Sequence, residues 1–571
     1  MRWVFPDRLR RSFPDTEHRS WGCGDYCREF LNNLGIQYSL ADTDLGRVPS
    51  QGGALIVANH PFGFLEGMVL LSLLDRVRPD FRIMANSWLA KIQPLRERLI
   101  FVDSFADHAA THQNRRALRQ SLEWLRSGGL LVVFPAGAVA HLNLAERAVA
   151  DPPWNAAAAR LAMKTGCVTL PVFFEGANSP GFQMMGTLHS SLRTLSLGQE
   201  LVKKCHRTIS IRVGNPITAS VLKSYGDPES ASRYLRARTY LLADRAETHL
   251  AAGSLGAFRL KRKPIAVPRP APLLSKEIAA LPVEQMLAQS EDFAVYVTSA
   301  QESPNLLLEI GRSREATYRQ IGEGTGKALD IDEFDEYYQH IVLWNKQDSR
   351  IAGAYRLTAT PDVIRERGVR GLYTSTLFHY EPAFFERIGP AIELGRSFIC
   401  REYQKQYAPL LLLWRGIIQY VQRRPECAVL FGAVSVSSEY QALSRTLIVN
   451  FLTGRITNDA AQQVRPRRAF GGGLSTPKHI RQLGRLLPTV EELASSIEDL
   501  EYDRKGLPVL IKQYLKIGGQ LLGFHLDPNF SNVLDVLVMA DLRTASGPML
   551  DRCMGREQAK AFRAWHTARG D

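Results

Sequence analysis

A histidine and a glutamate six residues apart are the first side chains of this sequence whose types and spacing could do chemistry. His60 follows the apolar run 53–58, which predicts a buried strand, and Glu66 comes shortly after it. A histidine at the exposed end of a strand can take a proton from a hydroxyl group, and a nearby carboxylate can fix its tautomer. The pair therefore predicts general-base activation of a hydroxyl. The alternative is a structural histidine beside a solvated acid.

Three further blocks each predict a strand that ends in a turn or polar loop: residues 98–105, 128–137 and 169–179. With residues 59–67 they resemble the four sequence blocks of the glycerolipid (lysophospholipid) acyltransferase family, over about residues 45–220. The resemblance implies an ester-forming site in which His60 is the base and Glu66 orients it. It also implies that residues of these blocks shape the acyl-donor and acceptor clefts: Asn59, Phe134, Pro135, Gly137, Glu175, Gly176 and Asn178.

The sequence departs from the common pattern of that family at three places. Five residues separate His60 from Glu66, where the family has four residues and then Asp. Ala136 stands where the third block usually carries Glu, and Ala138 supplies no acid after the glycine. The longer spacing and the Phe-Pro-Ala-Gly form resemble a divergent branch that is fused to a second acyltransferase. The departures leave the identity of the acceptor open.

Length and composition predict a globular protein of two domains. The chain has 571 residues, of which 45% are hydrophobic and 22% charged, and its formal net charge is +14. It has no apolar run of about 18 residues, so we expect no spanning helix. The basic clusters lack interleaved aromatic residues and nucleic-acid motifs, so we expect no nucleic-acid partner. Anionic lipid headgroups and an acidic acyl carrier protein are the expected partners.

A break in composition divides the chain near residues 252–282, which are rich in Pro, Gly and cations and predict a linker. Before it, strands alternate with helices, which is typical of an α/β layered domain over 1–251. After it, strands and helices resume, and we expect a second α/β domain over 283–545. Residues 546–571 are expected to form a C-terminal tail.

The order of elements over about 290–455 resembles the GCN5-related N-acyltransferase fold, in the branch of ornithine-lipid N-acyltransferases and acyl-homoserine lactone synthases. The residues that carry this resemblance are Arg319, Asp332, Asp335, Arg356, Glu393 and Arg396. Amine acylation needs a carboxylate to hold and deprotonate an ammonium, and we expect Glu393 to be that catalytic carboxylate. Arginines such as Arg356 would hold a carboxylate or the phosphate of a carrier. The alternative is a buried ion network that only organises strands.

The two-domain architecture resembles bifunctional ornithine-lipid synthases and proteins often labelled hemolysin-like. The resemblance implies that the C-terminal domain N-acylates an amino acid with a 3-hydroxyacyl chain and that the N-terminal domain esterifies its hydroxyl. The expected co-substrate is acyl-acyl carrier protein or acyl-CoA, with no bound cofactor and no metal. The resemblance implies amino-acid and lyso-lipid substrates. The net charge of +14 and the missing spanning segment predict a peripheral enzyme, on the cytoplasmic face of a bacterial inner membrane.

Two alternatives to this function stay open on the sequence. The first is a lysophospholipid or 1-acylglycerol-phosphate O-acyltransferase whose second domain is regulatory. The second is a membrane-binding, hemolysin-like protein without acyl transfer.

Overall fold

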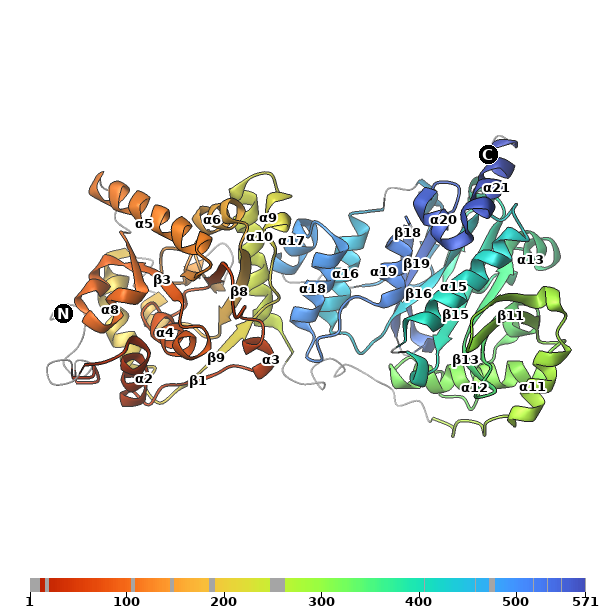
Figure 1. Cartoon of the computed structure of the whole chain (residues 1–571), viewed down its shortest axis with the longest axis horizontal. Coiled ribbons are helices and arrows are strands. Elements are labelled where there is room, and N and C mark those ends of the chain that lie inside the picture. Colours follow the sequence, from red (N-terminus) through yellow and green to blue (C-terminus); the bar gives the residue numbers. More distant parts are fainter. Residues whose placement is uncertain are drawn as a thin grey trace. The chain divides into compact units, whose positions relative to one another are not determined.

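The computed structural model of the chain (Figure 1) describes residues 11–15, 20–103, 108–143, 148–183, 190–246, 262–404, 406–456, 459–471, 478–516, 518–530, 532–545 and 547–569. It divides into two compact units. Unit 1 contains residues 1–245 and 477–506, and unit 2 contains residues 246–476 and 507–571. Both units have mixed α/β architecture, as the sequence predicts.

In the described part of unit 1, seven strands form one sheet in the order β1-β9-β8-β2-β5-β3-β4. Neighbouring strands are parallel except β8 and β9. The central strands β2 and β5 are apolar runs, and every residue in them is buried, as expected for parallel strands covered on both faces. The strands are β1 (Gln37–Ser39), β2 (Ala54–Ala58), β3 (Phe81–Asn86), β4 (Leu99–Val102), β5 (Leu130–Val133), β8 (Val168–Phe174) and β9 (Thr208–Val213), with a separate hairpin of β6 (His141–Asn143) and β7 (Ala148–Ala150).

Helices cover this sheet and complete its core. Helix α2 packs against α4, where Phe30 and Leu31 meet the apolar residues Met68 and Leu71 in one cluster. The helices of unit 1 are α2 (Cys23–Asn33), α3 (Asp42–Leu45), α4 (Leu65–Val77), α5 (His108–Arg126), α6 (Ala157–Thr165), α8 (Ser190–Val202), α9 (Ala219–Lys223), α10 (Pro228–Leu241), α17 (Lys478–Leu486) and α18 (Val490–Leu500).

Helices α17 and α18 belong to unit 1 although they lie late in the chain, and both lie beside α10 (Figure 1). Fully buried Arg238 of α10 pairs with Asp499 at 2.9 Å and with Glu492 at 2.6 Å. Asp499 also pairs with Arg47 at 2.9 Å, beside β9. This ion network fixes the helical hairpin to the α/β layer.

The expected domain boundaries therefore need four corrections. Residues 477–506 join the first unit rather than the second, and the first unit ends at Arg245 rather than at 251. Part of the expected linker forms a helix, α11 (Ala271–Ala280), because its Leu274 and Ile278 pack in an apolar cluster of unit 2. Linker residues 252–261 lie outside the described residues. Most of the expected C-terminal tail forms α20 (Gly547–Met554) and α21 (Arg556–Thr567), which bury Leu550 and Phe562.

Eight described strands form the sheet of unit 2, in the order β10-β11-β12-β13-β15-β16-β19-β18. All neighbouring pairs are antiparallel except β15 and β16, whose parallel pairing is confined to 391–393 with 429–431. The strands are β10 (Met286–Gln289), β11 (Phe293–Ser299), β12 (Gln339–Asn345), β13 (Arg350–Ala359), β15 (Ala391–Ile399), β16 (Val429–Val436), β18 (Gln520–Asp527) and β19 (Val533–Asp541), with a separate pair of β14 (Phe378–Tyr380) and β17 (Val464–Pro466).

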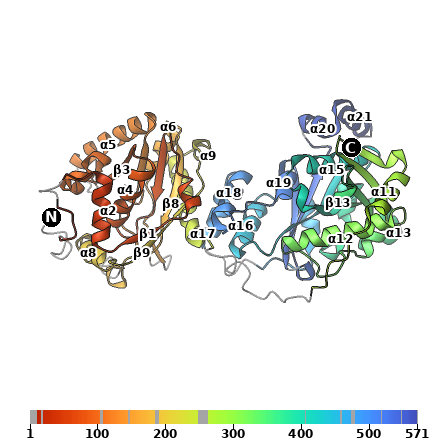
Figure 2. The same cartoon turned by 60° about the horizontal axis from the view of Figure 1, so that its bottom comes forward.

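Helices cover both faces of this sheet. Helix α15 and the pair α20 and α21 share one apolar cluster with the sheet (Figure 2). On the opposite face, α11 and α12 build one apolar cluster and α14 builds another, and charged residues lie between the two. The remaining helices of unit 2 are α12 (Pro304–Gln320), α13 (Thr360–Arg367), α14 (Ala383–Ile388), α15 (Tyr407–Gln422), α16 (Ala442–Thr453) and α19 (Val509–Lys516).

Candidate active sites

The predicted pair of His60 and Glu66 is brought together at the carboxyl end of β2. The strand ends at Ala58, the chain bends, and α4 places Glu66 in its first turn, where the helix dipole favours a negative charge. His60 Nδ1 lies 3.4 Å from Glu66 Oε1. The same carboxylate oxygen accepts hydrogen bonds from the backbone N–H groups of Phe62 at 2.6 Å and Gly63 at 3.2 Å. Glu66 is fully buried, so it is not the solvated acid of the alternative.

The electrostatics of this pair suit a base. Burial acts to lower the pKa of His60, but the Glu66 carboxylate beside it outweighs burial, so the pKa of His60 is raised above its ordinary value. Burial acts to raise the pKa of Glu66, but His60 and the N–H of Phe62 outweigh it, so the pKa of Glu66 is lowered. Glu66 therefore stays ionised and supports a proton on His60.

Asp151 holds the backbone of His60, and the sequence did not reveal it. Its Oδ1 accepts the His60 N–H at 3.1 Å, and its Oδ2 accepts the indole N–H of Trp154 at 2.9 Å. The N–H of Ala140 donates to the His60 carbonyl at 2.8 Å. Asp151 lies 91 positions from His60 and belongs to none of the four blocks, so no local pattern marks it.

His60 forms part of the wall of an apolar cavity of about 350 Å³. Only 17% of the His60 side chain is exposed, and its ring lies 4.6 Å from that of Phe134, centroid to centroid. A cavity with mainly apolar walls, whose polar side chains are those of His60 and Asn86, suits an alkyl chain whose reactive end meets His60. The lining comprises His60, Gly63, Phe64, Gly67, Met68, Leu71, Ile83, Met84, Ala85, Asn86, Trp88, Leu89, Leu95, Leu99, Val102, Phe134, Gly137, Val139 and Leu197.

Four of the expected cleft residues lie in the cavity wall or support the segment that carries His60. Phe134 and Gly137 line the cavity, and Gly137 takes the left-handed φ of 65° that its turn requires. Gly176, with φ of 123°, leaves no room for a Cβ, which would lie 2.8 Å from the ring of Phe62. Asn178 Nδ2 lies 3.5 Å from the Phe62 carbonyl. These last two contacts support the segment that carries His60 rather than the cavity wall.

Three other expected cleft residues have structural partners instead. The Asn59 side chain bonds both the N–H and the carbonyl of Phe174, at 2.7 and 2.9 Å, and so ties β2 to the end of β8. The carbonyl of Pro135 accepts the backbone N–H of Asn155 at 3.0 Å. Half-exposed Glu175 pairs with Arg212 at 3.2 Å. The cavity lining of the described residues does not include Asn59, Pro135 or Glu175.

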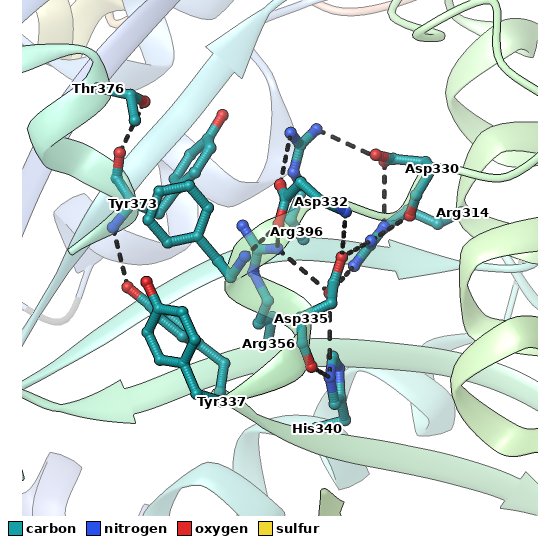
Figure 3. A network of polar contacts seen from close by, with 12 residues as sticks. Arg314, Asp330, Asp332, Asp335, Tyr337, His340, Arg356, Tyr373, Thr376 and Arg396 are labelled. Atoms are coloured by element: carbon teal, nitrogen blue, oxygen red, sulfur yellow. Dashed lines mark hydrogen bonds and ion pairs between the residues drawn. The ribbon is translucent and has the colours of Figure 1, made fainter. Parts of the chain in front are cut away.

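In unit 2 the charged residues of the resemblance form an alternating network of arginines and aspartates (Figure 3). Asp335 pairs with Arg314 at 2.8 Å and with Arg356 at 3.2 Å. Arg396 lies 3.4 Å from Asp332, which also pairs with Arg356. Burial acts to raise the pKa of Asp335, but Arg314 and Arg356 outweigh it, so this pKa is strongly lowered.

Two members of the network were missed, and one expected member lies elsewhere. Asp330 pairs with Arg314 at 3.0 Å and with Arg396 at 3.5 Å. The spacing of Arg314, four residues from both Ile310 and Tyr318, was the available signal for this member. Arg319 instead pairs with Glu315 at 2.6 Å and donates to the carbonyls of Lys263 and Lys327 at 2.8 and 2.5 Å. It anchors the chain that leads into unit 2.

Glu393, the expected catalytic carboxylate, organises a backbone turn. Its Oε1 accepts the N–H of Thr374 at 2.7 Å, and its Oε2 accepts the N–H of Tyr373 at 3.1 Å and the hydroxyl of Tyr338. The residue is 2% exposed. Three donors occupy the carboxylate, so Glu393 positions the turn at Tyr373, and its catalytic role stays a prediction.

Replacing Glu393 with glutamine is expected to destabilise unit 2. One oxygen becomes an NH₂ group that meets another donor, which leaves a buried group unsatisfied and costs about 1–3 kcal/mol of unfolding free energy. Thermal and urea unfolding of the full chain measure the change. Glu381→Gln is the matched control, because its pair with Arg465 is exposed and is worth less than about 1 kcal/mol. Unchanged unfolding together with lost amide formation would restore the catalytic role.

Two further observations concern membrane and metal. Among the helices that the structure describes, none combines the length and the apolar character needed to cross a bilayer. The described residues likewise contain no group of three or more His, Cys, Asp or Glu side chains placed to hold a metal ion.

Comparison with known proteins assigns both sites to families. Residues 20–249 match the family described as acyltransferase, and residues 313–414 match the acetyltransferase (GNAT) domain. The chain joins an acyltransferase domain to a GNAT domain. The acyltransferase domain contains His60 and Glu66, and the GNAT domain contains the arginine–aspartate network. The recognition and the fold class predicted from the sequence are confirmed.

Relatives of the chain carry names for both kinds of acyl transfer. A glycine N(alpha)-acyltransferase of Bacteroides thetaiotaomicron is 37% identical over 30% of this chain and 54% of its own length. An L-ornithine N(alpha)-acyltransferase of Rhodobacter capsulatus is 26% identical over 42% of this chain and 88% of its own. A lyso-glycine lipid O-acyltransferase of Phocaeicola vulgatus is 23% identical over 38% and 76%. The chain spans about half the length of the glycine N-acyltransferases it matches.

Proposed function

We propose that this protein is a bifunctional acyltransferase that makes an acyloxyacyl amino-acid lipid of the ornithine-lipid type. The GNAT domain joins a 3-hydroxyacyl chain to the amine of an amino acid, and the acyltransferase domain esterifies the hydroxyl of that chain. The observation that carries the proposal is the buried His60–Glu66 pair in the wall of an apolar cavity. The relatives support it, because their names pair N-acylation of glycine or ornithine with O-acylation of a lyso-glycine lipid.

The ester-forming step follows from the orientation of His60. Glu66 faces Nδ1, which leaves Nε2 as the ring nitrogen for the substrate hydroxyl. As the hydroxyl oxygen attacks the thioester carbonyl, its proton passes to Nε2. The C–O bond forms, the C–S bond breaks, and the imidazolium returns the proton to the departing sulfur. Phe134 and the apolar lining hold the acyl chain of the donor or the acceptor.

The amide-forming step would use the arginine network of the GNAT domain. Arg356 and Arg396 present guanidinium groups that suit a carboxylate, and the guanidinium carbons of both lie 5.1 Å from the Tyr373 ring centroid. The thioester donor is acyl-acyl carrier protein or acyl-CoA. Two tethered active sites keep the amphiphilic intermediate at a high effective concentration.

The net charge of +14 supports a peripheral location on an anionic membrane, at the cytoplasmic face of the inner membrane. An acidic acyl carrier protein would be attracted by the same charge. Cosedimentation with anionic vesicles tests this location: molar salt should release the protein, because it shortens the Debye length to about 3 Å. Retention in both salt and alkaline carbonate would contradict it.

Lipid mass spectrometry tests the proposed function. The full chain is expressed in a host that lacks amino-acid lipids, and extracts are searched for mono-acylated and diacylated glycine and ornithine. Appearance of a diacylated amino acid supports the proposal. Consumption of lysophospholipid without an amino-acid lipid would instead favour a lysophospholipid acyltransferase. Vesicle leakage without an acyl donor would favour a hemolysin-like protein.

A further inference from the structure

A row of polar side chains crosses the sheet of the GNAT-containing unit beside the arginine network. Asp535 of β19 is the cross-strand partner of Ser435 on β16 and of His525 on β18, so the three side chains share one face. Glu323, which follows α12, accepts the hydroxyl of Ser435 at 2.7 Å. The strand register and this hydrogen bond thus bring two carboxylates, Asp535 and Glu323, to the same place.

Asp535 is a buried carboxylate with an unused oxygen. The residue is 6% exposed, and its Oδ2 has no hydrogen-bond partner among the described residues. Burial raises the pKa of Asp535, and the carboxylates of Asp527 and Glu323 raise it further, while Arg396 is the cation that opposes them. A buried carboxylate without a partner is unfavourable for folding alone. Its presence therefore points to a ligand that supplies a donor.

Two of the three arginines of the network have hydrogen-bond donors without acceptors in the described part of the chain. Arg356 Nη2 and Arg396 Nε are buried donors without an acceptor among the described residues. Arg396 also has a φ of 50°, a strained conformation for arginine, which turns the residue out of the regular alternation of β15. The ring of Tyr373 lies against both guanidinium groups. Burial raises the pKa of its hydroxyl group, Arg396 acts to lower this pKa and Asp535 acts to raise it.

We propose that Asp535 is a catalytic residue of amide formation: it holds the ammonium of the amino-acid substrate, while Arg356 and Arg396 hold the carboxylate. This inference rests on the proposed function and adds a carboxylate that lies outside the matched GNAT residues 313–414. A free α-amino acid carries both charges on groups bonded to the same carbon, which matches unused donors on β13 and β15 and an unused acceptor on β19 of the same sheet. It also replaces Glu393, whose oxygens are occupied by the Tyr373–Thr376 turn.

Two carboxylates can take up the first proton that the ammonium loses in this step. The bound ammonium gives one proton to Asp535, from which Glu323 or water removes it, and becomes a nucleophilic amine. The amine nitrogen attacks the thioester carbonyl, the N–C bond forms and the C–S bond breaks. The second amine proton leaves with the thiolate, so a thiol and an amide result. Burial raises the pKa of Glu323 to about 7, which suits a group that takes and releases a proton near neutrality.

The test compares Asp535→Asn with the wild-type full chain. N-acylation of glycine and of ornithine by a 3-hydroxyacyl thioester gives kcat/KM for the amino acid and KM for the donor. The variant should lose about a hundredfold or more in kcat/KM for the amino acid and keep the donor KM, because it lacks the charge and the base. Its melting temperature should stay equal or rise, since a buried carboxyl oxygen without a hydrogen-bond partner in the described structure is removed. Glu323→Gln should show a smaller loss of kcat/KM.

Asp541→Asn is the matched control, because it removes the same charge from the other end of β19, where Arg543 lies 2.9 Å away. Asp541→Asn should keep the wild-type kcat/KM for the amino acid. Full kcat/KM in Asp535→Asn would overturn the inference and leave the proposed function intact. An early-melting Asp535→Asn with equal losses toward both substrates would assign Asp535 a structural role and also overturn it. A wild-type chain that acylates no amino acid would overturn both.

Discussion

Replacing His60 with alanine is expected to stop ester formation while amide formation continues, so that the mono-acylated amino acid accumulates. Loss of general-base help alone lowers a rate by about a hundred- to ten-thousand-fold. The amide-forming residues lie in the other unit, so they keep their geometry. Mass spectrometry of the lipids, together with rates for each step on synthetic intermediates, measures both effects in one preparation.

Two variants sharpen this test. Glu66→Gln keeps the shape but removes the charge that raises the pKa of His60, while burial still lowers that pKa. His60 must be neutral to act as a general base. Because its pKa falls in Glu66→Gln, the acid limb of the pH–rate profile of ester formation should move to lower pH. His206→Asn is the matched control, because His206 is exposed and has a φ of 59°, which asparagine tolerates. A normal rate of diacyl product from His60→Ala would show that His60 is not the base.

The sequence predicted those parts of the sites that depend on the spacing of nearby residues or on a recognisable sequence motif. His60 and Glu66 meet because one strand end, one bend and one helical turn separate them. Asp332 and Asp335 likewise share a capping box at the 3-10 helix Glu333–Glu336. The resemblance placed Arg356 and Arg396 correctly beside these aspartates.

The remaining features depend on contacts between residues far apart in the chain. Asp151 reaches the backbone of His60 from a loop, and Asp535 joins the second site through strand register. A lone acid within the apolar run 533–540 was the available signal for Asp535. The role of Glu393 depends on a turn twenty residues earlier, whose N–H groups no pattern of side chains reveals.

Helices α17 and α18 show why the sequence did not reveal which domain these helices join. Their sequence predicts amphipathic helices, but periodicity states only that one face is buried and not which domain covers it. The deciding contacts join Arg238 of α10 to Glu492 and Asp499 of α18, which lie 254 and 261 positions later in the chain. Chain order alone therefore placed residues 477–506 in the wrong unit.

Replacing Arg238 with alanine is expected to lower the unfolding free energy of unit 1 by about 3–5 kcal/mol, because breaking a buried ion pair leaves uncompensated charge. Arg238 has no exposed area, and its guanidinium is the shared partner of Glu492 at 2.6 Å and Asp499 at 2.9 Å. Urea unfolding of the full chain, followed by proteolysis within the hairpin, measures the loss. The hairpin should become the first site of cleavage.

The matched control is Arg160→Ala, which breaks an ion pair of the same unit whose two side chains are 52% and 60% exposed. Exposed pairs contribute at most about 1 kcal/mol, so this variant should unfold nearly as wild type. If the two variants unfold alike, the hairpin is not held by the Arg238 network. If Arg238→Ala unfolds early and also loses ester formation, while amide formation survives, the hairpin from the far half of the chain is a required part of the His60 unit. That result would explain why the two domains are interleaved rather than joined end to end.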